Sequence, residues 1–373
     1  MSVMKYKDPT TGEIKKVGAP KVSTYTPFKP AGKSYLTFSS PSSFTLAAET
    51  ATKYWAGTLE YFASDRTWTT WDGTAPLSSV NSNDEYVLYL RGTGNTVLSY
   101  HDETEDTYAG WAINGTDVRC NGNIETLLDY ATVETGQHPA MANYCFCSLF
   151  QNCTALTQAP DLPATTLVEG CYSSMFTGCT SLAEAPDLPA TTLAEGCYVG
   201  MFGDCASLTQ APALPATTLI DLCYYGMFRN CTSLAKAPAL PATTLAEGCY
   251  YVMFSGCTAL TQVPDLPATT LANSCYQGMF YGCTSLKLCS VKGGEYTIAY
   301  RIPSSGTGTT ATEALISMFQ STGGIFTGTP DINTTYYLSS GNMIVRETEI
   351  ATLNGYVGSM IDAAIGNAIG GSY

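Results

Sequence analysis

The chain has 373 residues, which is long enough for two or three domains. Hydrophobic residues make up 45% of it, so a sizeable core is expected, whereas charged residues make up only 13%. The net charge of −14 argues against general nucleic-acid binding, because that function requires a basic surface.

The first segment, residues 1–33, differs in charge from the rest. It holds seven lysines and two acidic residues, which leaves ten basic and 29 acidic residues for the remainder of the chain. A basic arm on an acidic body favours an anchoring tail, and a solvated, disordered terminus is the alternative. No apolar segment typical of a signal peptide follows Met1, and no run of 18 apolar residues occurs. We therefore expect synthesis in the cytoplasm without a signal peptide, and no membrane insertion.

Residues 34–118 have the pattern of a small β-sandwich. Short β-branched or aromatic runs are separated by clusters of Gly, Ser, Asn and Asp, and this pattern predicts strands at 35–38, 44–46, 58–62, 68–71 and 86–90. Residues 119–143 are predicted to form a helical cap. Asn123 is a suitable N-cap, and Ile124, Leu127 and Leu128 lie on one helical face.

Residues 144–289 consist of an internal repeat. The phrase Phe-x-x-Cys-(Thr/Ala)-(Ser/Ala)-Leu occurs six times at a period of 26 residues, starting at Phe150, Phe176, Phe202, Phe228, Phe254 and Phe280. Leu-Pro-Ala-Thr-Thr-Leu occurs five times between these copies. One such unit cannot bury its own apolar stripe, so the period predicts a solenoid of stacked units that share one core.

Each repeat contains two predicted elements. In Cys171–Phe176 the apolar residues fall at i, i+1, i+4 and i+5, which predicts a helix, and the later copies repeat the pattern. Leu182–Leu188 is the predicted strand, and Pro186 within it cannot donate to a ladder, so the strand must be short or irregular.

Most of the fifteen cysteines form two columns at the repeat period. Cys171 and Cys179 are eight residues apart, and a helix between them would separate their Cα atoms by about 12 Å, too far for a disulfide. We therefore predict buried free thiols. The spacing does not match that of known zinc sites, so no metal is expected.

Residues 290–346 are predicted to form a mixed, β-rich domain around a helix at 311–319. Residues 347–373 are predicted to form a C-terminal helix. Its heptad-like apolar spacing predicts self-association, with a trimer as the candidate state, whereas three interrupting glycines favour a helix packed on its own domain.

The repeat resembles the BspA-like leucine-rich repeats of bacterial and phage surface proteins, with Phe176–Leu188 and Phe280–Leu286 matching well. The predicted fold class is thus an α/β leucine-rich-repeat-type solenoid with an N-terminal β-sandwich and a mixed C-terminal region. One departure is that Leu182-x-x-Ala-Pro-x-Leu188 is longer than the usual strand phrase of the family. The opening residues 4–15 also resemble the start of some phage tail and prophage structural proteins. These resemblances imply adhesion or protein recognition without catalysis.

A search for chemistry finds no nucleophile, phosphate-loop, metalloprotease or dinucleotide motif, so we expect no enzyme, no catalytic residues and no cofactor. His101 and its four acidic neighbours form either a cation site or, as we expect, a solvated acidic loop. A column of carboxylates at the repeat period is interpreted as a solvent-facing ladder: Glu169, Glu195, Asp221 and Glu247.

The predicted function is a non-catalytic, tail-associated or surface-displayed receptor-binding component, located in the virion tail or on an extracellular surface. Its expected partners are a host cell-surface protein or glycan and, through the arm, a virion or tail protein. A bacterial surface adhesin and the scaffold of a glycan-active enzyme remain alternatives.

Two variable columns are the candidate partner-binding surface, because stacking does not dictate their residues. One column lies in the predicted strand and reads Gln158, Glu184, Gln210, Lys236 and Gln262. The other follows the first Tyr of the helical phrase and includes Tyr225 and Tyr251 in consecutive repeats. The alternative is that both columns drift because nothing contacts them.

Overall fold

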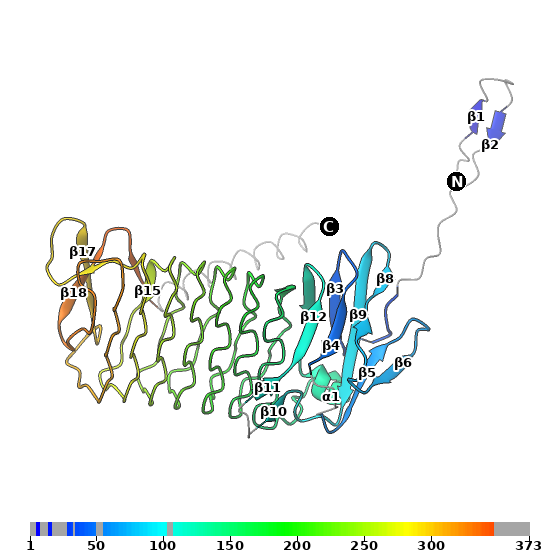
Figure 1. Ribbon diagram of the computed structural model, residues 1–373, viewed down its shortest axis with the longest axis horizontal. Helices are drawn as coiled ribbons and strands as arrows, with labels where there is room; N and C mark the ends of the chain where they lie inside the picture. The colour runs from blue at the N-terminus through cyan, green and yellow to red at the C-terminus, as the bar shows by residue number, and fades with distance from the viewer. Residues whose placement is uncertain are drawn as a thin grey trace, which may run out of the picture.

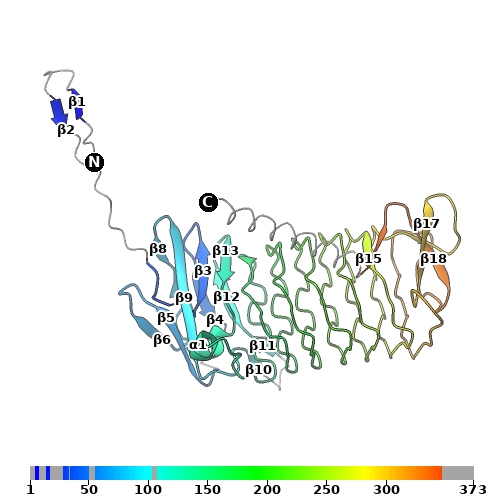
Figure 2. The ribbon, with the colours of Figure 1, turned by 180° about the vertical axis from the view of Figure 1, so that it is seen from behind.

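The computed structural model describes residues 5–7, 14–16, 28–32, 34–49, 55–102 and 107–346. Strands gather at the two ends of an elongated body, and a row of similar coils joins them (Figure 1). The same order is seen from behind (Figure 2). The predicted C-terminal helix at 347–373 and most of the basic arm lie outside the described residues.

The described strands and the one described helix have the following bounds: β1 (Lys5–Lys7), β2 (Ile14–Lys16), β3 (Leu36–Ser40), β4 (Thr45–Ala48), β5 (Thr58–Phe62), β6 (Trp68–Trp71), β7 (Leu77–Ser78), β8 (Val80–Ser82), β9 (Glu85–Thr93), β10 (Tyr100–Asp102), β11 (Thr107–Ala109), β12 (Trp111–Asn114), β13 (Val118–Asn121), α1 (Thr126–Glu134), β14 (Leu156–Gln158), β15 (Gln262–Pro264), β16 (Leu288–Cys289), β17 (Tyr296–Arg301), β18 (Thr335–Ser339) and β19 (Met343–Val345). Strand β1 pairs with β2 as an antiparallel hairpin.

The N-terminal unit contains two sheets. The larger has the strand order β14-β13-β3-β9-β5-β6, with β8 also on β9, and the smaller has the order β12-β4-β7. Leu36 and Leu88 of the larger sheet and Leu46 and Trp111 of the smaller one belong to the same buried cluster. All five strands predicted between residues 35 and 90 are present, with bounds shifted by at most a few residues.

Within the segment 119–143, predicted as a cap, residues before helix α1 bond to the first repeat: the Ile124 amide donates to the Asp161 carbonyl, and the Asp161 amide donates to that of Gly122. Helix α1 itself supplies no backbone partner to that repeat. It lies against β9, where the Asn95 side chain donates a hydrogen bond to the Leu127 carbonyl. Earlier backbone also meets the first repeat: the amides of Leu98, Trp111 and Val118 donate to carbonyls of residues 145, 149 and 155. Extended chain has unpaired amides to offer along its edge, whereas the amides inside a helix are already used.

The repeats contain no α-helix between residues 144 and 289, all of which the structure describes, so the helical part of the α/β prediction is wrong. Cys171–Phe176 and its counterparts form a turn segment in which every fourth residue is left-handed. In the second coil these residues are Gly170, Ser174 and Gly178, with φ of 57°, 52° and 74°. The buried residues follow the same four-residue spacing, which over six positions resembles a helical stripe.

Hydrogen bonds within and between coils alternate along each turn segment. The amides of Tyr172, Ser174 and Phe176 donate to carbonyls of the next coil, at 2.7–3.0 Å. The amides of Ser173 and Met175 donate to the carbonyl three residues earlier in their own coil. Coil-to-coil bonds therefore hold the array together, and the backbone satisfies itself without a helix.

The strand segments of the repeats are short, as Pro186 and its counterparts predict. Single parallel bridges join Glu184 to Gln210, Gln210 to Lys236, and Lys236 to Gln262. A second set of parallel bridges joins threonines, including Thr166 with Thr192 and Thr218 with Thr244.

Two ladders of stacked aromatic rings run along the core. One begins at Phe146 and continues through Tyr172 to Tyr276, and the other begins at Phe150 and continues through Phe176 to Phe319. Successive ring centroids lie 5.5–5.9 Å apart, with the ring planes within 14° of parallel. One buried cluster extends from Leu36 in the N-terminal unit to Leu338 in the C-terminal unit, so the core is continuous.

All fifteen cysteines are buried and free, as predicted. The thiols of one column donate to the carbonyl of the ladder residue in the preceding coil. Cys179 Sγ lies 3.0 Å from the Phe150 oxygen, and Cys205 Sγ lies 3.1 Å from that of Phe176. The column thus combines a small apolar side chain with a weak hydrogen-bond donor.

The helix predicted at 311–319 is a seventh coil. The amides of Tyr276, Gly278 and Phe280 donate to carbonyls of residues 314, 316 and 318, in the same pattern as between earlier coils. Phe319 stacks on Phe280 at 5.5 Å. These two ladder residues are 39 positions apart, 13 more than the repeat period, because β16 and β17 are inserted between the sixth and seventh coils.

The C-terminal unit covers the far end of the array. Its sheet has the order β16-β18-β17, and β15 of the array pairs in parallel with β19. Tyr300 and Phe326 meet the ring of Phe319 edge to face, at 6.1 and 6.4 Å. The aromatic ladder therefore ends against non-repeat residues instead of solvent.

Candidate partner-binding surfaces

The predicted strand column lies on the surface along one edge of the array. Gln158, Glu184, Gln210 and Lys236 are exposed, and Gln262 is half-buried. The backbone bridges described above bring the four members from Glu184 to Gln262 side by side, whereas Gln158 pairs with Arg119 of β13. An open hollow of about 330 Å³ lies along this edge, lined by Glu184, Ala185, Asp187, Gln210, Ala211, Pro212 and Ala213. The column is a polar surface that carries one carboxylate and one ammonium group.

The predicted tyrosine column lies on the turn segments. Tyr225 and Tyr251 are half-buried, and their rings stack with centroids 5.0 Å apart and planes 15° from parallel. The preceding and following coils place Val199 and Gln277 in the same column. Ile316 of the seventh coil holds the equivalent position and is 41% exposed. The two predicted columns therefore belong to different segments of each coil and form two separate surfaces.

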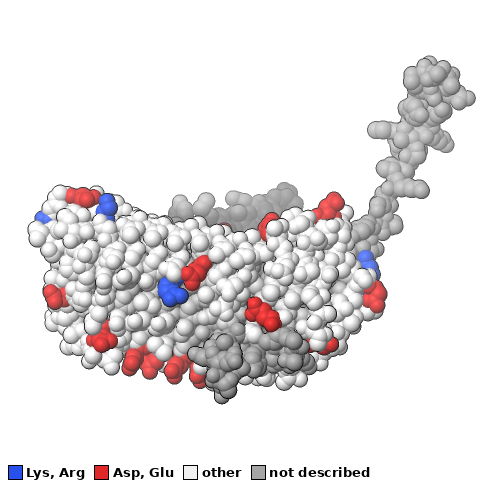
Figure 3. All heavy atoms as spheres, viewed as in Figure 1, with Lys and Arg blue, Asp and Glu red and all other residues white. Residues whose placement is uncertain are grey.

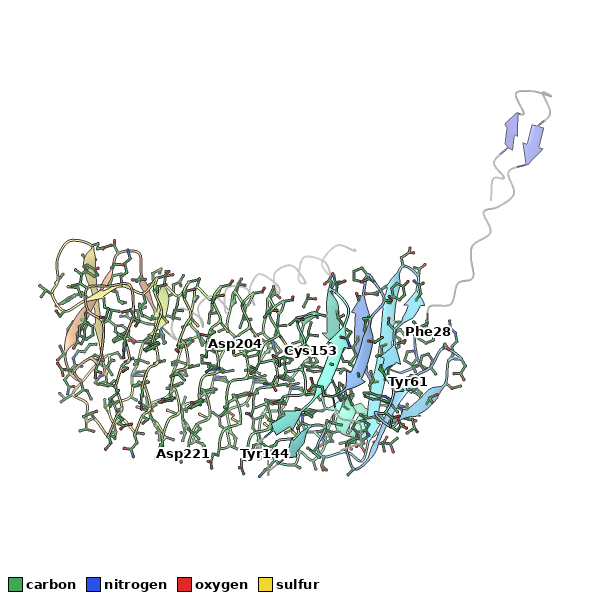
Figure 4. All side chains as sticks on the ribbon, viewed as in Figure 1. Phe28, Tyr61, Tyr144, Cys153, Asp204 and Asp221 are labelled. Atoms are coloured by element: carbon green, nitrogen blue, oxygen red, sulfur yellow. The ribbon has the colours of Figure 1, made fainter. Side chains whose placement is uncertain are left out.

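The carboxylate column lies four residues before the tyrosine column on the same turn segments. Glu195, Asp221 and Glu247 are exposed, and the Asp221 carboxylate accepts a hydrogen bond from the Glu247 amide at 2.9 Å. Glu169 is held at the start of the column by Asn143 and Tyr144, which donate to its two oxygens at 2.8 Å. Acidic side chains gather along the lower edge of the array in Figure 3, and Figure 4 labels Asp221 at that edge.

Sequence reasoning missed several exposed apolar residues on the same turn segments. Ile220 is 40% exposed and Tyr281 is 42% exposed. Ile220 lies next to the carboxylate column, and Tyr281 lies four residues after the tyrosine column. A four-residue period, read in place of a helical one, would have placed Tyr281 on the surface, four residues after Gln277 of the tyrosine column. Ile220 has the phase of the buried Tyr224, so the period gives no signal for it.

A further hollow lies on the outer face of the larger N-terminal sheet. It encloses about 410 Å³ between β3, β8 and β9, and its lining includes Phe28, Tyr35 and Tyr89. Burial raises the pKa of Tyr89 to about 12, with smaller contributions from Tyr35 and Glu85. The Tyr89 hydroxyl donates to the Phe28 carbonyl at 3.0 Å, so the chain entering from the arm is fixed on this face.

The predicted acidic loop beside His101 cannot be placed, because residues 103–106 lie outside the described residues. Among the residues that the structure describes, no three His, Cys, Asp or Glu side chains are arranged to hold a metal ion. His138 pairs through Nδ1 with the buried Glu125 carboxylate at 2.8 Å. No helix in the described part of the chain has the length and apolar character needed to cross a membrane.

Comparison of the chain with protein-family models, with curated proteins and with solved structures found no match. The geometry of the coils and their exposed columns is therefore the basis for the function proposed below.

Proposed function

We propose that the chain is a non-catalytic receptor-binding protein whose array is a leucine-rich-repeat-type solenoid of a BspA-like kind, built with turn segments in place of helices. The observation that supports this proposal most directly is the stacked Tyr225–Tyr251 pair on the surface of an array whose core continues into the units at both ends. Half-exposed tyrosines offer a large contact area at a low cost in conformational entropy, and repeat arrays commonly bind along an extended face.

The proposed setting is a phage or prophage tail, with the array directed at a host cell-surface molecule and the basic arm bound to a virion or tail protein. The β1–β2 hairpin of the arm contains four lysines. Lys5 pairs with Lys16, Tyr6 pairs with Lys15, and Lys7 pairs with Ile14. A concentration of lysines on one short hairpin suits an acidic docking partner.

The test is attachment of the labelled full chain to cells of the bacterial strain that the encoding phage or prophage infects. Tyr225→Ser with Tyr251→Ser, and separately Lys236→Glu, should weaken attachment while the melting temperature stays near that of the wild type. Lys287→Glu is the matched control, because it makes the same charge change at an exposed position outside the column. Unchanged binding in both variants would move the site to the N-terminal hollow or the C-terminal unit.

The arm is tested separately by deleting residues 1–27, which leaves Phe28 in its buried position between Phe62 and Tyr89. The shortened protein should still attach to cells but should no longer assemble into tails. Normal assembly of the shortened protein would contradict the docking role of the arm.

A further inference from the structure

The turn segments of the fourth to seventh coils carry an exposed stripe of apolar and aromatic side chains, which we call the tyrosine stripe. Tyr225, Tyr251 and Ile316 hold the same column position, with Gln277 between the last two, whereas Ile220 lies five residues before that position and Tyr281 four residues after it. Each of these five members is half-buried or 40–42% exposed. Ile220 and Tyr281 are the most exposed large hydrophobic side chains between residues 144 and 289.

Stacking determines which part of each tyrosine a partner can reach. The rings of Tyr225 and Tyr251 cover each other's faces at 5.0 Å, and successive coils stack along the array axis. The outer ring faces therefore point at the neighbouring coils, toward Val199 on one side and Gln277 on the other. A partner meets ring edges and hydroxyl groups. Sugars that bind aromatic residues pack on open ring faces, so this geometry disfavours a glycan and favours a protein surface.

The charge around the tyrosine stripe indicates what charge the surface of a protein partner should carry. The turn segments of the third to seventh coils hold five acidic residues and one basic residue, a balance of −4: Glu195, Asp204, Asp221, Glu247, Glu313 and Arg229. The Arg229 guanidinium lies 3.7 Å from the Asp204 carboxylate, which balances its charge. An apolar stripe beside uncompensated carboxylates is complementary to an apolar surface edged by Lys or Arg.

This proposal rests on the proposed receptor-binding function. We propose that the tyrosine stripe is the docking surface for a basic protein segment with apolar residues. Ring edges and Ile side chains would be buried by the apolar residues of the partner. The carboxylates of Asp221 and Glu247 would pair with its cationic groups at the rim, where such pairs chiefly set orientation and association rate.

The test uses the full chain on two immobilised sets of probes: synthetic peptides that are basic and apolar, acidic and apolar, or neutral and polar, and a glycan array. We expect binding to the basic, apolar peptides only, weakening as salt is raised. Tyr225→Ser with Tyr251→Ser should weaken it by about tenfold or more, since two anchor tyrosines are removed. Asp221→Asn with Glu247→Gln should weaken it several-fold and reduce its salt dependence.

The matched control is Glu134→Gln with Glu295→Gln, which removes the same charge at exposed positions outside both columns and should leave binding unchanged. Binding to glycans alone, binding that ignores peptide charge, equal loss in the control variant, or no binding to either probe set would each overturn the proposal.

Attachment to protease-treated and to periodate-treated cells separates this proposal from the proposed receptor-binding function. Attachment that survives protease treatment but is lost after periodate removes the basic-protein partner and keeps receptor binding, whereas no attachment to untreated cells removes receptor binding itself.

Discussion

At the scale of single residues, the core ladders show why the repeat tolerates so little change. Phe228 is fully buried and stacks between Phe202 and Phe254, 5.7 Å from each. Its neighbour Arg229 points outward to Asp204 and is more than half exposed. Two adjacent residues thus have opposite environments, which the four-residue turn period dictates.

Replacing Phe228 with Ala should cost about 3–5 kcal/mol of unfolding free energy, because it removes a buried ring and leaves a gap in the ladder. Arg229→Ala is the control and should cost under about 1 kcal/mol, since its ion pair is exposed. Denaturant unfolding of both variants measures the difference. Equal losses would mean that the inward and outward positions of the turn segment are misassigned.

At the scale of the element, the turn segment depends on residues that accept a left-handed backbone every four positions. Gly256 has a φ of 76°, and a Cβ atom there would lie 2.1 Å from the Asn230 side-chain oxygen of the preceding coil. Gly282 has nearly the same backbone, with a φ of 73°, but a Cβ atom there would meet nothing closer than 3.7 Å. Substitutions at these two glycines therefore separate the stability cost of backbone strain from the cost of crowding between coils.

Gly282→Ala should lower stability by about 1–2 kcal/mol, the cost of a left-handed conformation for a residue with a Cβ atom. Gly256→Ala should cost about 1 kcal/mol more, because Asn230 must also give up its 2.8 Å hydrogen bond to Asp204. Thermal or denaturant unfolding of the two variants is the measurement. Wild-type stability in both would show that these residues are not left-handed.

At the scale of the whole molecule, the continuous core contains many neutral thiols. Burial is the main cause that raises the pKa of six of them to about 12: Cys153, Cys197, Cys205, Cys249, Cys257 and Cys275. Burial also raises the pKa of Cys179 and Cys231 well above the usual range. In the unfolded chain these groups lose their protons near pH ~8.5.

Stability should therefore be independent of the thiols below pH ~8.5 and should fall as the pH rises from there toward 12. The unfolded chain binds fewer protons than the folded one in this range, so the slope of unfolding free energy against pH is negative. Each thiol contributes up to about 1.4 kcal/mol per pH unit. Denaturation midpoints in reductant between pH 7 and pH 10 test this, and a flat profile would contradict it.

Thiol titration gives an independent check on the same array. At neutral pH the native protein should react slowly at all fifteen cysteines, and the denatured protein should show all fifteen thiols without reductant. Rapid native reaction, or thiols missing after denaturation, would mean that the columns are exposed or cross-linked.

Self-association is also decided at the scale of the whole molecule. The heptad-like apolar residues between 350 and 364 predict that the full chain forms an oligomer, with a trimer proposed, and that a chain ending at Arg346 is a monomer. Light scattering of the two proteins measures this. Two monomers would assign the segment to packing on its own chain.

Sequence and tertiary structure each determined a different part of this protein. The sequence predicts the 26-residue period, the short N-terminal strands and the buried thiols, because apolar residues at fixed spacing must be buried together. It also identifies the two variable columns, because stacking does not dictate their residues. The sequence alone does not determine whether Cys171–Phe176 forms a helix or turns, since apolar residues at i, i+1, i+4 and i+5 fit both. Hydrogen bonds to the next coil decide it, and these exist only once the coils have stacked. Stacking likewise revealed the seventh coil, whose 13-residue insertion conceals it in the sequence, and placed Ile316 in the column of Tyr225 and Tyr251.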